Sequence, residues 1–134
     1  MRKYLVPLLL VALSVQAEVA VIANAKSNVT TLSAKQIQDI FLGRTRSFPN
    51  EKFALPIDQS SPLRAEFYQR LTGRPIEQIN AYWARILFTG QASPPLQLPD
   101  DAAVLKMVRE NEGAIGYINK SHVEASVRVL LTLP

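Results

Sequence analysis

The chain has 134 residues, with 15 lysines and arginines, 11 aspartates and glutamates, and a formal net charge of +4 at pH 7. It contains no cysteine and a single histidine, which excludes disulfides, thiol redox chemistry, thiolate metal sites and multi-histidine metal centres. No basic run is longer than Arg44-Thr45-Arg46, whereas nucleic-acid-binding proteins usually carry a clustered basic patch. We therefore expect neither a nucleic-acid partner nor a cofactor.

The N-terminus has the layout of a secretory signal. Two basic residues precede the apolar run from Tyr4 to Val15, and small residues at positions 15 and 17 suit cleavage after Ala17. The run lacks the polar face of a core helix and is shorter than the roughly 20 residues that span a bilayer. We expect residues 1–17 to be a signal peptide and the mature chain to work in the periplasm without a membrane span.

The mature chain, residues 18–134, begins with a predicted strand and helix. The apolar segment from Glu18 to Asn24 is typical of a buried strand. Ser33 and Gln36 form a capping box, which predicts a helix that ends near Gly43. The segment from Phe53 to Ile57 predicts a second strand.

Two further helices are predicted in the middle of the chain. The first starts at Ser60-Ser61-Pro62, where a hydroxyl cap precedes a proline, and ends at Gly73. The second starts at Pro75 and ends at Gly90. The predicted inner faces of these helices comprise Leu63, Phe67, Tyr68 and Leu71 in the first, and Ile76, Ile79, Trp83, Ile86 and Leu87 in the second.

The C-terminal third predicts a loop, a helix and two strands. Three prolines between Ala92 and Pro99 indicate an extended loop. Asp100 or Asp101 caps a helix that ends at Gly113, with Val104, Met107 and Val108 inside. Strands follow at Ala114 to Ile118 and at Val127 to Leu133, with a possible helical turn from Ser121 to Ala125 between them. Strands separated by helices predict one α/β domain, whose mixed sheet is flanked by helices.

Three segments of this chain, Leu32 to Gly43, Trp83 with Leu87 to Gly90, and Asn111 to Ile118, carry a resemblance to a known family. Together they resemble phosphate-type periplasmic substrate-binding proteins of ABC transporters, which have the type 2 periplasmic-binding fold. Leu32 to Gly43 resembles that family's "LS-six residues-IFxG" segment, and Asn111 to Ile118 resembles its "PGAIGYV" turn and strand. Trp83 and Leu87 to Gly90 resemble its aromatic helix. The resemblance implies a periplasmic-binding-protein-like domain over residues 18–134, reduced to about one of the family's two lobes.

The predicted strand-to-helix turn near residue 60 is the candidate anion site, since free backbone N–H groups at a helix start bind anions. The resemblance places the family's serine at Ser60, but Pro56 stands in place of the arginine, Ser61 of the glycine and Pro62 of the threonine. Arg64 can reach back toward the turn. The alternative interpretation is an ordinary helix cap. The candidate anion-binding residues are Asp58, Gln59, Ser60, Ser61 and Arg64.

Other residues that could carry chemistry have simpler interpretations. A catalytic pair of His122 with Ser60 or Ser121 would need an orienting acid, to which the sequence does not point. We interpret His122 as a surface residue and expect no enzyme activity. Phe67 and Trp83 are predicted core residues. If the chain has an aromatic recognition surface, Tyr82 and Tyr68 are its better candidates, although Tyr68 also fits the predicted inner face of its helix.

Two functions remain open at this point. The first is an exported solute-binding-like module, related to phosphate transport, that binds a small phosphate-like anion weakly if at all. The alternative is an accessory domain that has lost ligand binding and docks on a membrane sensor or transporter. A single lobe cannot enclose an anion, and the same lobe leaves its cleft face free for a protein partner.

Overall fold

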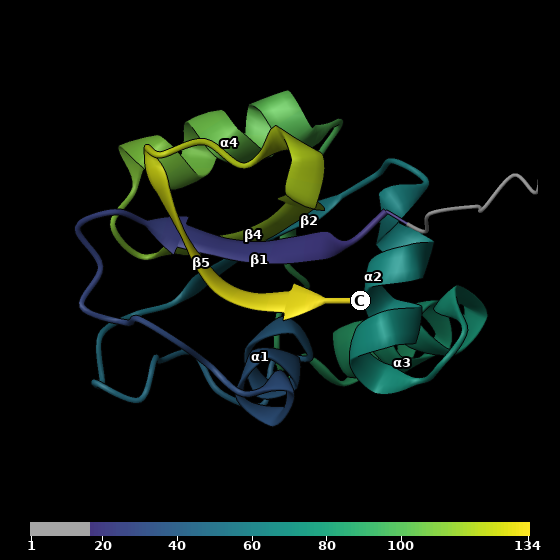
Figure 1. Ribbon diagram of the computed structural model, residues 1–134. Coiled ribbons are helices and arrows are strands. Elements are labelled where there is room, and N and C mark those ends of the chain that lie inside the picture. The colour runs from purple at the N-terminus through teal and green to yellow at the C-terminus, as the bar shows by residue number, and fades with distance from the viewer. Residues whose placement is uncertain (1–16) are drawn as a thin grey trace, which may run out of the picture.

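The computed structural model describes residues 17–134, and the predicted signal segment up to residue 16 lies outside them. The described residues form a five-stranded sheet in the order β3-β2-β4-β1-β5, with four α-helices and one 3₁₀ turn (Figure 1). In chain order the elements are β1 Val19–Asn24, α1 Ala34–Phe41, β2 Leu55–Gln59, α2 Leu63–Thr72, α3 Ile76–Thr89, β3 Leu96–Leu98, α4 Asp101–Glu110, β4 Ala114–Asn119, η1 Lys120–His122 and β5 Val127–Leu133.

The sheet is mixed, as predicted. β2 pairs in parallel with β3 and β4, whereas β1 pairs antiparallel with β4 and β5. All six residues of β1 are buried, which explains why the strand is apolar from Val19 to Ala23 rather than alternating. The carboxyl ends of β2 and β4 lie at the same edge of the sheet, because the two strands are parallel.

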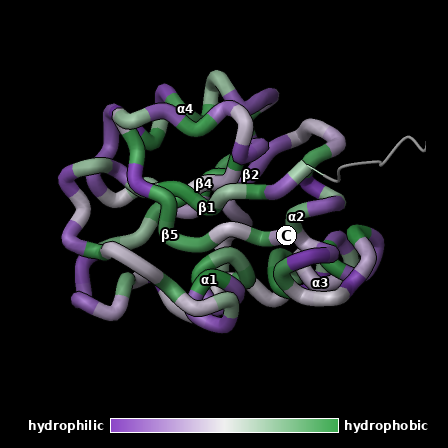
Figure 2. The backbone as a smooth tube through the Cα atoms, viewed as in Figure 1, coloured by the Kyte–Doolittle hydropathy of each residue, from purple (hydrophilic) through white to green (hydrophobic). Residues whose placement is uncertain are grey.

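Helices cover both faces of the sheet. In Figure 1, α4 lies on one side of the strands, and α1 and α3 lie on the other. Two apolar clusters fill the two interfaces, and Figure 2 shows the hydrophobic residues running along the strands between them. The cluster under α1, α2 and α3 includes Ile37, Phe67 and Trp83, and the cluster under α4 includes Val104 and Val108.

Several local predictions are confirmed. Ser33 Oγ accepts a hydrogen bond from the Gln36 amide at 3.1 Å, while the Gln36 side chain accepts one from the Ser33 amide at 2.9 Å. Gly73 and Gly90 end α2 and α3 in the left-handed conformation that glycine favours. The Asp100 side chain caps α4 through the Ala103 amide at 2.9 Å.

Other boundaries differ from the prediction. The second strand runs from Leu55 to Gln59 rather than from Phe53 to Ile57, because Phe53 instead forms an isolated bridge with Ser47. The predicted loop from Ala92 to Pro99 contains the short edge strand β3, which prolines flank without interrupting.

The end of α4 and the turn after β4 also differ. α4 ends at Glu110 instead of running to Gly113, and the turn predicted over Ser121 to Ala125 is the 3₁₀ turn Lys120–His122. None of the helices within residues 17–134 is long and apolar enough to cross a membrane.

Candidate functional site

The centre of the β2–α2 corner is the carboxylate of Asp58, whose side chain is only 3% exposed. It accepts hydrogen bonds from the hydroxyl of Tyr68 at 2.8 Å, from the hydroxyl of Tyr117, and from the Gln59 amide at 2.8 Å. Arg64 Nε lies 3.3 Å from the same carboxylate and neutralises it. A buried carboxylate needs hydrogen-bond donors, and Asp58 has four of them.

The two tyrosines share this network and are buried with it. Burial, followed by the negative charge of Asp58, raises the pKa of Tyr68 and of Tyr117 well above the ordinary value of a phenol. Phe67 stacks against Tyr117 with ring centroids 3.7 Å apart, which holds the phenol in place. Of the two interpretations of Tyr68, its place on the inner face of the helix is confirmed and its place on the surface is wrong, because Tyr68 is fully buried and its hydroxyl donates to Asp58.

Gln59 carries a second network toward α4. Its side-chain nitrogen donates to Asp101 Oδ1 and to the Tyr117 carbonyl, each at 2.7 Å. Its side-chain oxygen accepts a hydrogen bond from the Ser61 hydroxyl at 2.7 Å. The backbone amide of Gln59 also donates to the Tyr117 hydroxyl at 3.1 Å. The buried Gln59 therefore joins β2, β4, α2 and α4 at the edge where the parallel strands end.

The structure brings the five predicted site residues together, but most of their polar groups already bond within the protein. Arg64 does reach back toward the corner, where it pairs with Asp58 and donates to Asn80 at 2.7 Å. Ser61 Oγ accepts weakly from the Leu63 amide at 3.3 Å. Ser60 is exposed, and its amide donates to the Leu98 carbonyl at 3.0 Å. The anion-binding role of these residues stays a prediction.

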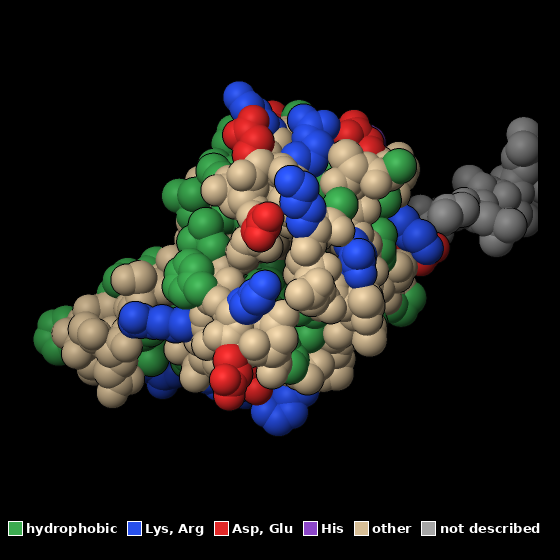
Figure 3. Space-filling view, turned by 90° about the vertical axis from the view of Figure 1, so that its left-hand side faces the viewer, with side chains coloured by type: hydrophobic (Ala, Val, Ile, Leu, Met, Phe, Trp, Pro, Cys, Tyr) green, Lys and Arg blue, Asp and Glu red, His purple; other side chains and the backbone are tan. Residues whose placement is uncertain are grey.

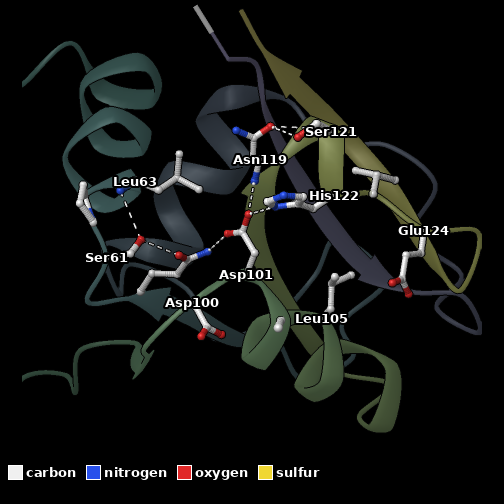
Figure 4. A pocket seen from close by; sticks show the side chains of 13 residues that line it. Ser61, Leu63, Asp100, Asp101, Leu105, Asn119, Ser121, His122 and Glu124 are labelled. Carbon is white, nitrogen blue, oxygen red and sulfur yellow. Dashed lines mark hydrogen bonds and ion pairs between the residues drawn. The ribbon is translucent and has the colours of Figure 1, made fainter.

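A cavity of about 820 Å³ opens beside this corner, between the start of α2, the start of α4 and the 3₁₀ turn (Figure 4). In the fold, this is the edge at the carboxyl ends of β2 and β4, where open α/β sheets usually bind ligands. Its lining residues are Gln59, Ser61, Pro62, Leu63, Asp100, Asp101, Ala102, Leu105, Asn119, Ser121, His122, Val123 and Glu124.

Several solved structures have a similar arrangement of strands and helices. The chain aligns over 85% of its length with a protein from Clostridium perfringens assigned as a phosphate ABC transporter substrate-binding protein and solved with bound phosphate, with a TM-score of 0.67 and 21% identity. An ABC-type phosphate transport receptor from Vibrio cholerae matches with a TM-score of 0.65 and 17% identity, and PstS from Borrelia burgdorferi with 0.63 and 15%. The fold is one periplasmic-binding-protein-like lobe.

The lobe covers only part of these structures. The same 85% of the chain corresponds to 45%, 46% and 47% of the three proteins, so it spans less than half of their length. The first two are named for phosphate transport, and none of the three is named for an enzyme activity. No known family model and no curated protein matches the sequence. The resemblance first seen in three sequence segments is thus confirmed at the level of the fold.

The lobe also contains a histidine–carboxylate pair that the sequence did not indicate. His122 Nδ1 lies 2.7 Å from Asp101 Oδ2, and the same oxygen accepts from the Asn119 amide at 3.0 Å. Figure 4 shows Asp101 and His122 pointing toward one another at the cavity. The two residues are 21 positions apart, and only the pairing of the strands places the start of α4 beside the end of β4.

Away from the cavity, the lobe exposes several large apolar side chains. Phe53 is 62% exposed, Leu87 56%, Leu96 46% and Phe88 94%. The prediction that Leu87 faces the core is therefore wrong, because the last turn of α3, from Leu87 to Thr89, is exposed to solvent. Figure 3 shows hydrophobic side chains gathered beside a projecting part of the molecule.

The remaining aromatic residues differ in how deeply they are buried. Trp83 and Phe67 are buried in the core, as expected, and the half-buried Tyr82 donates its hydroxyl to the Leu42 carbonyl at 2.6 Å. Within residues 17–134, no group of three or more histidine, aspartate or glutamate side chains could hold a metal ion.

Proposed function

We propose that this protein is an exported solute-binding-like module that binds a small inorganic anion weakly and has no enzyme activity. The observation that carries the proposal is that the polar groups of the β2–α2 corner are already hydrogen-bonded to one another. Asp58 occupies the corner with its own negative charge and takes the Gln59 amide, both tyrosine hydroxyls and Arg64. An incoming anion would have to compete with this carboxylate.

The groups left for an anion lie at the surface of the corner. Ser60 is exposed, and the first turn of α2 presents the positive end of the helix dipole to solvent. These contacts are neutral and open to water, whereas tight anion binding usually relies on buried, charge-assisted hydrogen bonds. We therefore expect phosphate or sulfate to bind weakly at Ser60 and Ser61, while Asp58, Gln59 and Arg64 stay bonded to one another and to their neighbours.

Isothermal titration calorimetry of residues 18–134 with phosphate and with sulfate tests this proposal. We expect saturation only at millimolar ligand, which corresponds to about 4 kcal/mol of binding free energy. Replacing both Ser60 and Ser61 by alanine should abolish the heat, whereas the remote Ser126→Ala variant should retain it. Micromolar binding, or full binding by the double variant, would contradict the proposal.

Export is the second part of the proposal. Cleavage after Ala17 would release residues 18–134 into the periplasm. N-terminal sequencing of the protein recovered from a periplasmic fraction should begin at Glu18. Recovery of the chain from the cytoplasm with residue 2 still present would contradict export.

A second candidate function is docking on a membrane transporter or sensor. It is favoured by the exposed apolar side chains of Leu87 and Phe88 at the end of α3 and of Leu96 on β3. Exposed patches of this kind often mark protein interfaces, which bury about 800 Å² per partner when stable. A pull-down from membrane extract with the wild type and with a Leu87→Ser, Phe88→Ser variant distinguishes the two functions. Loss of a stoichiometric partner in the variant would favour docking.

A further inference from the structure

The large exposed apolar side chains of the described residues lie along one side of the lobe. Leu96, on the edge strand β3, lines two pockets: it shares one of about 240 Å³ with Phe53 and one of about 590 Å³ with Leu87. Phe88 follows Leu87 in the last turn of α3. We call the surface formed by Phe53, Leu87, Phe88 and Leu96 the apolar flank. An exposed patch of this kind marks an interaction site.

Two arginines without a partner border the apolar flank. Arg46 lines the smaller pocket, and Arg85 lies one helical turn before Phe88, so the two side chains are neighbours on the surface of α3. Neither arginine forms an ion pair within residues 17–134. The one carboxylate that lines either pocket, Asp58, is already paired with Arg64.

The positive charge of the mature chain is concentrated on this side. A third pocket, of about 90 Å³, lies on the other side of Phe53 and adds two lysines and one glutamate. Together with Arg85, the three pockets have five cations and two carboxylates, a net charge of +3, whereas residues 18–134 have 13 cations and 11 carboxylates, a net charge of +2. The cations are Lys26, Arg46, Lys52, Arg64 and Arg85, and the carboxylates are Asp58 and Glu112. Figure 3 shows Lys and Arg side chains beside the gathered hydrophobic ones.

Charge and shape distinguish among the possible occupants of this surface. A second copy of the chain would bring the same excess of cations, and like charges that face one another disfavour association. A bilayer would meet the projecting side chains but leave the pockets unfilled. An added strand would find little backbone to pair with, because β3 has only three residues and prolines 95 and 99, which have no N–H group, flank it. A helix that carries both apolar and acidic side chains meets none of these objections.

Trp83 adds an observation that does not depend on charge. Its side chain lines the larger pocket, and its indole Nε1 is the one buried side-chain polar atom within residues 17–134 that has no hydrogen-bond partner. Native proteins leave few such donors unpaired. A segment rich in carboxylates brings hydrogen-bond acceptors to this wall of the pocket.

We propose that the apolar flank binds an acidic amphipathic helix of a partner protein. The apolar side chains of that helix fill the pockets on either side of Leu96, and its aspartates or glutamates lie beside Arg46 and Arg85. This inference rests on the docking function proposed above and names the chemistry of the partner. It does not depend on the anion contacts proposed at Ser60 and Ser61.

Two synthetic peptides of opposite charge test the proposal. Both have about 18 residues, which is about five helical turns, and the same leucines along one face, but one has glutamates at the flanking positions and the other has lysines. Each is titrated into residues 18–134 while the fluorescence of Trp83 and the backbone amide NMR signals of Leu87, Phe88 and Leu96 are followed. We expect saturable changes with the glutamate peptide and at least about tenfold weaker binding of the lysine peptide. Equal binding of the two peptides would overturn the proposal.

A charge reversal with a matched control isolates the contribution of the arginines. The double variant Arg46→Glu, Arg85→Glu should bind the glutamate peptide at least about tenfold more weakly than the wild type and should bind the lysine peptide more tightly. The control is Arg74→Glu, an exposed arginine before the opposite end of α3. A helix of 14 residues is about 21 Å long, more than twice the screening length at physiological salt, so this variant should bind like the wild type. An unchanged peptide preference in the double variant would overturn the assignment.

Two further measurements test the other occupants. The protein is mixed with vesicles of phosphatidylglycerol, and its mass in solution is measured by analytical ultracentrifugation. We expect a monomer that does not bind the vesicles. Vesicle binding or a dimer, if lost in the Leu87→Ser, Phe88→Ser variant, would assign the flank to a membrane or to a second copy and overturn the proposal.

The pull-down described above separates this inference from the docking function itself. If a partner is lost with Leu87→Ser, Phe88→Ser but is retained in full by Arg46→Glu, Arg85→Glu, docking stands and the acidic chemistry of the partner is wrong. Loss of the same partner with both variants, together with the peptide preference, supports both.

Discussion

A single carboxylate organises the corner that the sequence marked as an anion site. Asp58 follows the buried Ile57 at the end of β2, and its side chain lies inside the protein against Tyr68, Tyr117 and Arg64. A charge in this position requires donors, because burial without them costs several kcal/mol. Four donors are present, and together they make the corner a structural joint between β2, α2 and β4.

Truncation of Asp58 tests this structural role. Asp58→Ala leaves Arg64 and two buried hydroxyls without their acceptor, so we expect the free energy of unfolding to fall by about 3–5 kcal/mol. The matched control is Asp39→Ala, which removes a surface carboxylate paired with Lys35 and Arg44 and should cost less than about 1 kcal/mol. Urea denaturation followed by circular dichroism measures both. Similar losses in the two variants would contradict the structural role of Asp58.

The two buried tyrosines predict how stability depends on alkaline pH. In the folded state the pKa values of Tyr68 and Tyr117 are raised above those of the unfolded chain, which lie near 10. Their contribution to stability is therefore complete below about pH 10, and it is lost as the pH rises and the unfolded state ionises.

Absorbance at 295 nm with parallel circular dichroism checks this pH dependence. Tyr82, which is half-buried, should ionise while the fold persists, whereas Tyr68 and Tyr117 should ionise only together with unfolding. Ionisation of all three tyrosines with an unchanged circular dichroism spectrum would contradict the burial of the Asp58 network.

At the scale of elements, local signals in the sequence predicted most helix boundaries but missed contacts between distant segments. The capping box at Ser33 and the glycines at 73 and 90 act within one turn of chain, so the sequence alone reveals them. β3 was missed because its pairing with β2 is non-local and prolines surround it. The Asp101–His122 pair was missed for the same reason, because only the order of the strands brings the two residues together.

The packing of α4 on the sheet depends on the absence of a side chain at Gly116. A Cβ atom there would lie 2.7 Å from Val104 Cγ1 and 3.4 Å from Val108 Cγ2. Because β-branched valines on a helix have little rotamer freedom, α4 would have to move away from β4. We expect Gly116→Ala to destabilise the protein by roughly 1–3 kcal/mol, as overpacking does elsewhere.

A double-mutant cycle with Val104→Ala tests this explanation. Val104→Ala removes the atom in conflict, so the double variant should be more stable than the sum of the two single losses predicts. Additive losses, measured by urea denaturation, would show that Gly116 is required for another reason.

At the scale of the whole molecule, one edge of the sheet carries most of the polar contacts described above. β2 and β4 both end there, α2 and α4 both start there, and the pairing of Val19 with Asn119 and Leu133 places both ends of the described chain at the same edge. The cavity opens on this edge. The cavity therefore shares Asn119 with this edge, because Asn119 lines the cavity and pairs with Val19 near the start of the described chain.

The same sheet also couples the two apolar clusters. β1 supplies Val19, Val21 and Ala23 to the cluster under α1, α2 and α3, and its alternate residues Ala20 and Ile22 to the cluster under α4. β4 alternates in the same way. Because neither cluster can lose its helices without exposing strands that the other one needs, we expect residues 18–134 to unfold in a single cooperative transition.

Two probes on opposite faces test this cooperativity during urea unfolding. The fluorescence of Trp83, the only tryptophan, reports on the face covered by α3, and the methyl NMR signals of Val104 and Val108 report on the face covered by α4. We expect the same midpoint and slope from both. An earlier midpoint for the valine signals would mean that α4 detaches first, and that the cavity at its start is lost while the rest of the lobe stays folded.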